Sequence, residues 1–174
     1  MKTLVIAEHN GENLSAATLS VVDAAKKLGR DIDLLVASNS ASNVLKEAKA
    51  VEGVSTVLDF SDEKFANEIA EDLAACIVSV RENYDFFLAS SSTSGKNNLP
   101  RAAALLDIQQ ISEVTEIIDD KTFKKPIYAG SCIATVQSSQ EKNALTIRTT
   151  SFEKTGASGG CLLYTSPSPR DLGK

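Results

Sequence analysis

A stretch of small residues, SSSTSGKNNLPRAAALL (residues 90–106), combines one glycine and one lysine directly ahead of an alanine-rich segment of helical character. Backbone N–H groups at a helix start carry partial positive charge, and Lys96 would add a full one, so the stretch could hold a phosphate. A P-loop requires a glycine five positions before Gly95 and a serine or threonine after Lys96. Ser90 and Asn97 stand there instead, so the P-loop fingerprint is not met.

Two interpretations of this stretch stay open. In the first, the loop and the helix start bind a phosphate or a nucleotide. In the second, the stretch is a structural turn or a protein interface, in which Asn97 or Asn98 caps the helix and Pro100 stands in its first turn. No G-x-G-x-x-G pattern follows an expected strand, so the second interpretation is favoured.

Other side chains capable of chemistry lack the sequence context that catalysis requires. His9 stands in AEHNGEN, beside carboxamides and carboxylates only, and is expected to be an exposed loop histidine. Ser92, Ser94 and Ser131 stand in no G-x-S-x-G motif, so a hydrolase triad is unsupported. Cys132 lies in a strand-like run without a basic neighbour and is expected to be a thiol of the core. We predict no catalytic residue.

Charged residues offer one further candidate contact and no metal site. Arg148 alternates with Ile147 in a strand-like run, so its guanidinium is expected to point away from the core, where it either bonds a partner's carboxylate or phosphate or stays solvated. The acidic pairs at 62–63 and 119–120 suit a helix start and a turn. Three cysteines without a CxxC pair and a single histidine give no zinc spacing.

Apolar strands and amphipathic helices alternate four times in the first 106 residues. The expected strands are 4–7, 31–38, 53–60 and 84–90, and the helices are 12–29 with a Ser15 cap, 42–51, one opening at Ser61 whose apolar stripe runs from Phe65 to Val80, and the alanine-rich one. We therefore predict an α/β fold with a Rossmann-like parallel sheet flanked by helices. Ligands and partners gather at the carboxyl ends of such strands, here residues 8–10, 38–40 and 90–98.

The alternation stops after Leu106. Strand-like runs follow at 107–118, 123–137 and 144–153, and no helical pattern separates the last two. This predicts a β extension with antiparallel pairing, appended to the parallel sheet.

Composition excludes several classes of partner. The chain has 174 residues, is 43% hydrophobic and 24% charged, and carries a net charge of -5 without a basic patch, which argues against nucleic acid and anionic lipid. No apolar run approaches the roughly 20 residues that cross a bilayer, and the first one, ending at Glu8, is too short for a signal peptide. We expect a protein without membrane insertion, with reduced thiols in a cytosol-like compartment.

Four segments together resemble the N-terminal domain of the alpha subunit of electron transfer flavoproteins. They are LVIAEHN, SGKNNLPRAAALLDIQQISEVTEI, KPIYAGSCIATVQS and TIRTTSFE, and the resemblance runs from about Lys2 to Gly160. It implies a heterodimer with a beta subunit, which carries electrons from acyl-CoA and related dehydrogenases through FAD to a quinone reductase. The protein would be an electron carrier and not an enzyme, placed in the bacterial cytoplasm or the mitochondrial matrix.

The resemblance also assigns roles to parts of the chain. FAD would sit chiefly in a second alpha domain further along the chain, absent here, and AMP on the beta subunit, so no cofactor-binding residue is expected in this chain. Gly95, Lys96, Asn97 and Arg101 would shape the subunit contact, with Arg148 as a further candidate. The alternative is a stand-alone adenine-nucleotide-binding α/β module, with residues 90–98 as its phosphate cradle.

The end of the chain departs from the family pattern. Residues 1–155 are expected to form the α/β domain, and residues 156–174 a linker and an unstructured tail, because this segment has no apolar periodicity. The segment LYTSPSPRD within it resembles translated adapter sequence. We therefore expect the chain from about Cys161 onward to be foreign, joined to a truncated gene.

Overall fold

The computed structural model describes residues 1–40, 42–67 and 69–165. The helices are α1 (Ala16–Lys26), α2 (Ser42–Ala50), α3 (Ala70–Ser79) and α4 (Thr93–Leu105), with short 3-10 turns η1 (Glu63–Asn67), η2 (Arg81–Asn83), η3 (Tyr128–Gly130) and η4 (Thr149–Ser151). The strands are β1 (Lys2–Ile6), β2 (Ile32–Ser38), β3 (Val54–Ser61), β4 (Tyr84–Ser90), β5 (Gln110–Val114), β6 (Glu116–Ile117), β7 (Thr122–Ile127), β8 (Cys132–Gln137), β9 (Asn143–Ile147) and β10 (Leu162–Thr165).

The main sheet is parallel throughout, as predicted. Its seven strands in the described residues follow the order β10-β3-β2-β1-β4-β9-β5. The strand order reverses beside β1, since β2 and β3 lie on one side of it and β4 on the other. Such a reversal is the switch point at which α/β sheets open a crevice at the carboxyl ends of their strands.

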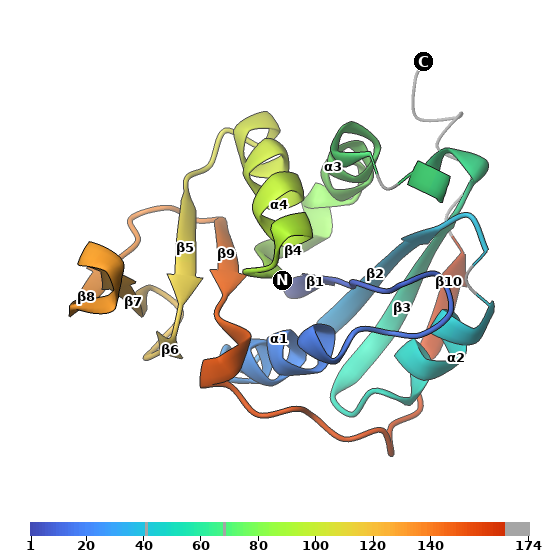
Figure 1. The fold of residues 1–174 in the computed structure, drawn as a ribbon, viewed down its shortest axis with the longest axis horizontal. Helices are drawn as coiled ribbons and strands as arrows, with labels where there is room; N and C mark the ends of the chain where they lie inside the picture. The colour runs from blue at the N-terminus through green and yellow to red at the C-terminus, as the bar shows by residue number, and fades with distance from the viewer. Residues whose placement is uncertain (41, 68, 166–174) are drawn as a thin grey trace.

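Helices cover both faces of this sheet (Figure 1). On one face, α1 and α2 pack on alternate strand residues, in a cluster that includes Val5, Val21, Leu34 and Val57. On the other face, α3 and α4 pack on Leu4, Ile6, Phe87 and their neighbours. The central strands are therefore buried on both sides, which explains why each reads in the sequence as a nearly continuous apolar run.

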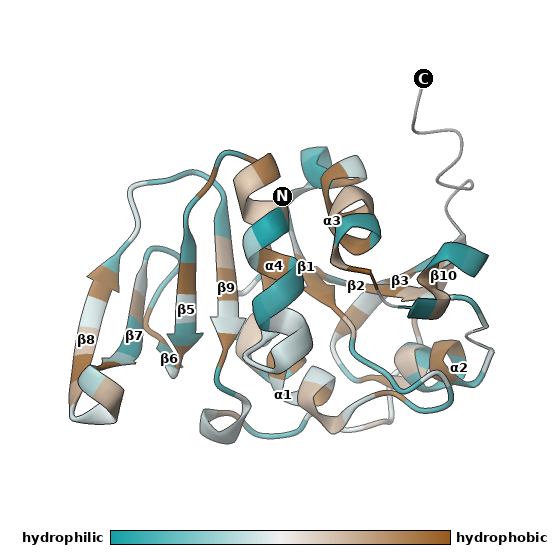
Figure 2. Cartoon of the chain, turned by 45° about the horizontal axis from the view of Figure 1, so that its top comes forward, coloured by the Kyte–Doolittle hydropathy of each residue, from teal (hydrophilic) through white to brown (hydrophobic). Residues whose placement is uncertain are grey.

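The predicted antiparallel extension is present but smaller than expected. It consists of β6, β7 and β8, with β7 paired to both neighbours, and it lies beyond β5 at one end of the main sheet (Figure 2). By contrast, β5 and β9 pair in parallel with the main sheet, and β9 inserts between β4 and β5. An isolated apolar run does not reveal which neighbour it will pair with, so this insertion could not be predicted.

The helix expected from Ser61 is interrupted. A 3-10 turn covers Glu63–Asn67, and α3 starts only at Ala70, after Ile69 in an extended conformation with ψ 127°. The acidic residue expected at the helix start is there, because Asp62 Oδ1 accepts a hydrogen bond from the Lys64 N–H at 3.0 Å. The apolar spacing from Phe65 to Val80 thus spans two separate helical elements.

The expected linker contains one element that we did not predict. Leu162–Thr165 form β10, which pairs in parallel with Thr56–Asp59 of β3. Its four residues are all exposed, so backbone hydrogen bonds hold the strand and no apolar pattern announces it. The division at residue 155 and the foreign origin of the tail stay predictions, and residues 166–174 lie outside the described part. None of the described helices is long and apolar enough to cross a membrane.

Candidate functional site

The helix start that we predicted at Asn97 or Asn98 lies five or six residues earlier, at Ser92. Ser92 is the N-cap of α4, and its Oγ accepts a hydrogen bond from the Gly95 N–H at 3.0 Å. Asn97 and Asn98, the caps we expected, stand inside the helix, and so does Pro100. The helix follows β4 almost directly, so the first serine able to cap it does so before either asparagine is reached.

Gly95 permits close contact between α4 and the end of β4. A Cβ atom at this position would lie 1.9 Å from the carbonyl oxygen of Ser90 and 3.0 Å from its carbonyl carbon. Any other residue would therefore push the helix away from the strand. Packing of backbone on backbone explains the glycine without a ligand phosphate.

A carboxylate of the protein itself lies at the start of α4. Glu8, which follows β1, accepts hydrogen bonds from the hydroxyl groups of Ser90, at 2.6 Å, and of Ser92. The Ser92 hydroxyl connects Glu8 to the Gly95 N–H. The negative charge of Glu8 thus occupies the place near the positive helix end where a bound phosphate would be stabilised.

The basic candidates beside the helix start have partners within the chain. Lys96 Nζ lies 2.5 Å from Glu113 Oε1, and Arg101 Nη2 lies 2.9 Å from Glu71 Oε1. Both side chains are about half exposed, so these pairs contribute little to stability. Lys96 and Arg101 are exposed on α4, away from the cavity described below.

Two further candidates are also at the surface. Asn97 is exposed on α4. Arg148 is exposed, as expected, but it stands just after β9 as the N-cap of η4, with its backbone N–H bonded to the Val114 carbonyl at 2.9 Å. Of the five candidates, only Gly95 lines the cavity.

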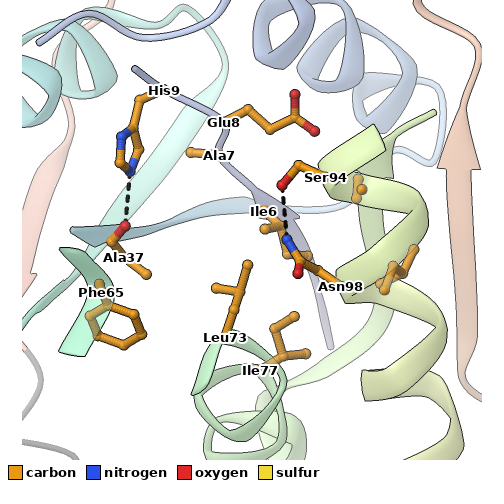
Figure 3. Close-up of a pocket in the computed structure, with 13 residues that line it drawn as sticks. Ile6, Ala7, Glu8, His9, Ala37, Phe65, Leu73, Ile77, Ser94 and Asn98 are labelled. Atoms are coloured by element: carbon orange, nitrogen blue, oxygen red, sulfur yellow. Dashed lines mark hydrogen bonds between the residues drawn. The ribbon is translucent and has the colours of Figure 1, made fainter. Parts of the chain in front are cut away.

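A cavity of about 110 Å³ opens at the switch point between β1 and β4 (Figure 3). Apolar side chains from the two strands and from η1, α3 and α4 form its walls, among them Ile6, Phe65, Leu73, Ile77 and Leu99. The polar residues that line it are Glu8, His9, Ser94 and Asn98. Two of the three polar segments predicted at the carboxyl ends of β1, β2 and β4 contribute to the lining, one through Glu8 and His9 and the other through Ser94, Gly95 and Asn98, whereas β2 contributes Ala37 and none of residues 38–40.

His9 is half-buried and not the exposed histidine that we expected. Its Nδ1 accepts a hydrogen bond from the Gly11 N–H at 3.2 Å, so the proton is on Nε2, which donates to the Ala37 carbonyl at 2.8 Å. Both ring nitrogens are occupied, and His9 thus serves to hold the ends of β1 and β2 together. A general base would need one of these nitrogens.

Cys132 is exposed, and the expectation of a core thiol was wrong. It belongs to β8, whose residues are exposed or half-buried. The cysteine buried in the core is Cys76 of α3. Among the described residues, no group of three histidine, cysteine, aspartate or glutamate side chains could hold a metal ion.

Known proteins match the chain over nearly its whole length. Residues 3–161 match the model of the electron transfer flavoprotein domain. The chain belongs to the electron transfer flavoprotein family. The electron transfer flavoprotein subunit alpha of Pseudomonas aeruginosa is 49% identical over the whole chain, and that of Paracoccus denitrificans is 41% identical over 91% of it. The mitochondrial alpha subunit of Dictyostelium discoideum is 39% identical over 90% of it.

The chain corresponds to one part of these flavoprotein subunits. It spans 57% of the Pseudomonas aeruginosa subunit, 52% of the Paracoccus denitrificans subunit and 46% of the Dictyostelium discoideum subunit. The chain is therefore a homologue of the N-terminal part of electron transfer flavoprotein alpha subunits, and the resemblance found in the four sequence segments is confirmed.

Proposed function

We propose that the chain is the scaffold and subunit-interface domain of an electron transfer flavoprotein alpha subunit. In the assembled protein, electrons pass from acyl-CoA and related dehydrogenases to FAD and then to a quinone reductase, in the bacterial cytoplasm or the mitochondrial matrix. The match of residues 3–161 to the family carries this proposal. The site at the start of α4 is consistent with a non-catalytic role, because Glu8, Ser90 and Ser92 bond to one another.

In this proposal, the cofactors lie outside the chain. FAD is held chiefly by the alpha domain that follows in the full-length relatives, and AMP by the beta subunit. The 174-residue chain alone would then bind FAD weakly or not at all. The measurement is the visible flavin absorbance of the purified chain. Stoichiometric flavin in that preparation would contradict this assignment.

The exposed face of α4 is the proposed contact with the beta subunit. Lys96, Asn97 and Arg101 present their side chains there, next to Gly95, and about half of the Lys96 and Arg101 side-chain surface is exposed. Arg148 adds a third cation on the carboxyl side of β9. These residues offer hydrogen-bond donors to carboxylates or carbonyl groups of a partner.

Co-purification with the beta subunit of the same organism tests both parts of the proposal. The tagged chain should recover the beta subunit, and the Asn97→Trp variant should recover at least tenfold less, because the indole would block the contact. Lys27→Trp, at the exposed C-cap of α1, which lies on the opposite face of the sheet (Figure 1), is the matched control and should bind normally.

The outcomes separate the function from the surface. If the unmodified chain recovers no beta subunit, the proposed function is wrong. If Asn97→Trp binds as well as Lys27→Trp, the function stands and the α4 face is not the contact. Titration with AMP addresses the alternative module: micromolar binding that is lost in Lys96→Ala would favour a nucleotide-binding protein over the flavoprotein subunit.

A further inference from the structure

The cavity at the switch point has a largely apolar lining and one buried polar atom that lacks a partner among the described residues. Figure 3 shows Asn98 reaching from α4 into the space between Ile6 of β1 and Leu73 and Ile77 of α3. Since α/β sheets bind their ligands at this position, each polar atom in the cavity indicates what could bind there.

Asn98 is the residue that points to a ligand. Asn98 is only 4% exposed, and its Nδ2 donates a hydrogen bond to the Ser94 hydroxyl at 2.9 Å. Its Oδ1 is buried and has no hydrogen-bond partner among the described residues. Of the buried side-chain atoms without a partner in the described part of the chain, this is the one whose residue lines the cavity.

An unpartnered carbonyl oxygen requires a donor. Native proteins bond nearly all of their buried polar atoms to protein or to ordered water, and the amide oxygen of asparagine only accepts. A molecule that completes the site therefore has to supply an N–H or O–H group to Asn98 Oδ1.

The charges around the cavity exclude an anionic ligand. Glu8 carries a negative charge at the mouth, and it already satisfies the hydroxyl groups at the start of α4. The residues that line the cavity include neither lysine nor arginine, and Lys96 and Arg101 of α4 pair with Glu113 and Glu71 outside it. A phosphate or carboxylate would be repelled without compensation.

We propose that this cavity binds a small uncharged heterocycle through a hydrogen bond from the ring N–H to Asn98 Oδ1. The volume of about 110 Å³ is somewhat below the roughly 150 Å³ of a protein cavity that holds benzene, so a five-membered ring matches it. Leu73, Ile77 and Leu99 contact the faces of the ring. This site does not depend on the proposed role in electron transfer.

Two probes of equal size test the proposed hydrogen bond. Pyrrole carries an N–H donor, whereas furan has an oxygen acceptor in the same place. In NMR titrations of the ¹⁵N-labelled 174-residue chain, pyrrole should shift the Asn98 side-chain amide and the Gly95 N–H with a Kd of about 1 mM, as expected for so small a ligand. Furan should bind about five- to tenfold more weakly, because it leaves Asn98 Oδ1 unsatisfied.

Variants of two adjacent asparagines supply the matched control. Asn98→Leu keeps a side chain of similar volume but removes the acceptor, and it should abolish the preference for pyrrole over furan. Asn97→Leu, exposed on the same helix, should keep it. The dispersion of the amide spectrum verifies that each variant is folded, and the pyrrole-to-furan comparison in the unmodified chain does not depend on either variant.

Three results would overturn the proposal. Equal affinity for pyrrole and furan would show that the ligand forms no hydrogen bond with Asn98. Pyrrole at 20 mM is roughly twenty times the expected Kd. If it shifts neither Asn98 nor Gly95 at that concentration, the cavity does not bind the ring. Tighter binding of inorganic phosphate or AMP at the same residues would show that the cavity takes anions.

Discussion

At the scale of the residue, one missing methyl group decides how closely α4 approaches the sheet. Gly95→Ala would place a Cβ atom 1.9 Å from the Ser90 carbonyl oxygen, and because the obstacle is backbone, α4 or β4 has to move. Overpacking of this kind costs about 1–3 kcal/mol. We expect the free energy of unfolding to fall by at least that amount, as measured by urea denaturation.

Gly160→Ala is the matched control for this substitution. No atom lies within 4 Å of its added Cβ, so the free energy of unfolding should change by less than about 0.5 kcal/mol. Equal urea midpoints for Gly95→Ala and Gly160→Ala would mean that α4 moves away from β4 at no cost in free energy, and would contradict the expected loss of stability.

The sequence predicted which segments stand at the carboxyl edge of the sheet, but not their individual contacts. Segments 8–10, 38–40 and 90–98 stand at the carboxyl ends of β1, β2 and β4, as predicted, but only the first and the last of them line the cavity. The partners of Lys96 and the burial of Asn98 depend on α4 packing against β5 and α3. Spacing along one segment contains no information on such contacts between segments.

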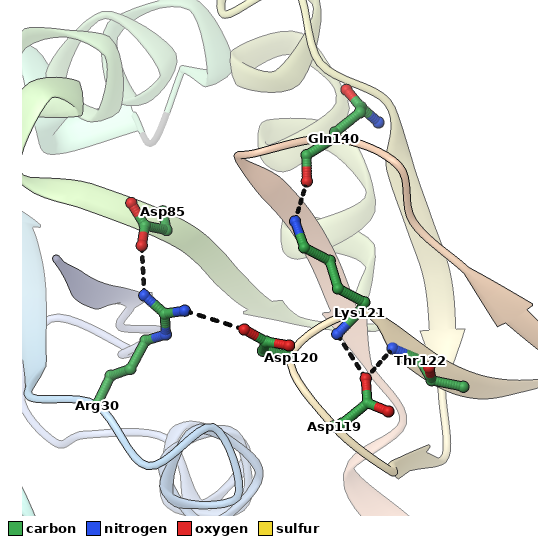
Figure 4. A network of polar contacts seen from close by, with 7 residues as sticks. All are labelled: Arg30, Asp85, Asp119, Asp120, Lys121, Thr122 and Gln140. Atoms are coloured by element: carbon green, nitrogen blue, oxygen red, sulfur yellow. Dashed lines mark hydrogen bonds and ion pairs between the residues drawn. The ribbon is translucent and has the colours of Figure 1, made fainter.

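At the scale of the element, one arginine connects the main sheet to the turn of the antiparallel sheet (Figure 4). Arg30 bonds to Asp85 of β4 and lies 3.3 Å from Asp120, in the turn before β7. Its guanidinium also lies 5.1 Å from the centre of the Phe86 ring. These contacts set how the turn is held against β4.

Arg30→Ala should therefore loosen the antiparallel sheet more than it affects the central strands. The Arg30 side chain is 27% exposed and makes two ion pairs and a cation–π contact, so its loss should cost about 1–2 kcal/mol. Hydrogen exchange should accelerate at residues 119–127 and stay slow in β1. Arg81→Ala, which loses an exposed pair with Glu82 and a hydrogen bond to the Val78 carbonyl, should leave exchange at residues 119–127 unchanged, and equal acceleration in both variants would disprove the connection.

The order of the elements was predictable only where each strand has a crossover helix. Alternation in the first 106 residues forces β1 to β4 into one parallel sheet. The insertion of β9 and the N-cap of α4 at Ser92 could not be predicted from this alternation. Pro100 misled us because proline favours the first turn of a helix, whereas here it stands inside α4.

At the scale of the whole molecule, two buried side chains that lose a proton at high pH make the stability of the fold depend on pH. Burial, and then the hydrogen bond that the Tyr84 hydroxyl donates to Asp33 Oδ2 at 2.8 Å, raise the pKa of Tyr84 above its ordinary value of 10.0. Burial raises the pKa of the Cys76 thiol from 9.0 to about 12. The folded protein thus holds both protons more tightly than the unfolded chain does.

This difference sets the direction of the pH dependence. Below about pH 9 both groups are protonated in the folded and the unfolded chain, and their contribution to stability is fully present. As the pH rises through 9 and 10, the unfolded chain releases its protons first, so the free energy of unfolding falls by up to about 1.4 kcal/mol per pH unit for each group. Urea midpoints measured from pH 7 to 11 should therefore decrease steeply above pH 9.

Tyr84→Phe separates the tyrosine from the cysteine. It removes the titrating hydroxyl and one hydrogen bond to the buried Asp33, so it should be less stable than the unmodified chain at pH 7 and lose less stability above pH 10. Tyr128→Phe, at an exposed tyrosine, should follow the profile of the unmodified chain. A Tyr84→Phe profile as steep above pH 10 as that of Tyr128→Phe would show that Tyr84 ionisation does not drive the alkaline loss of the fold.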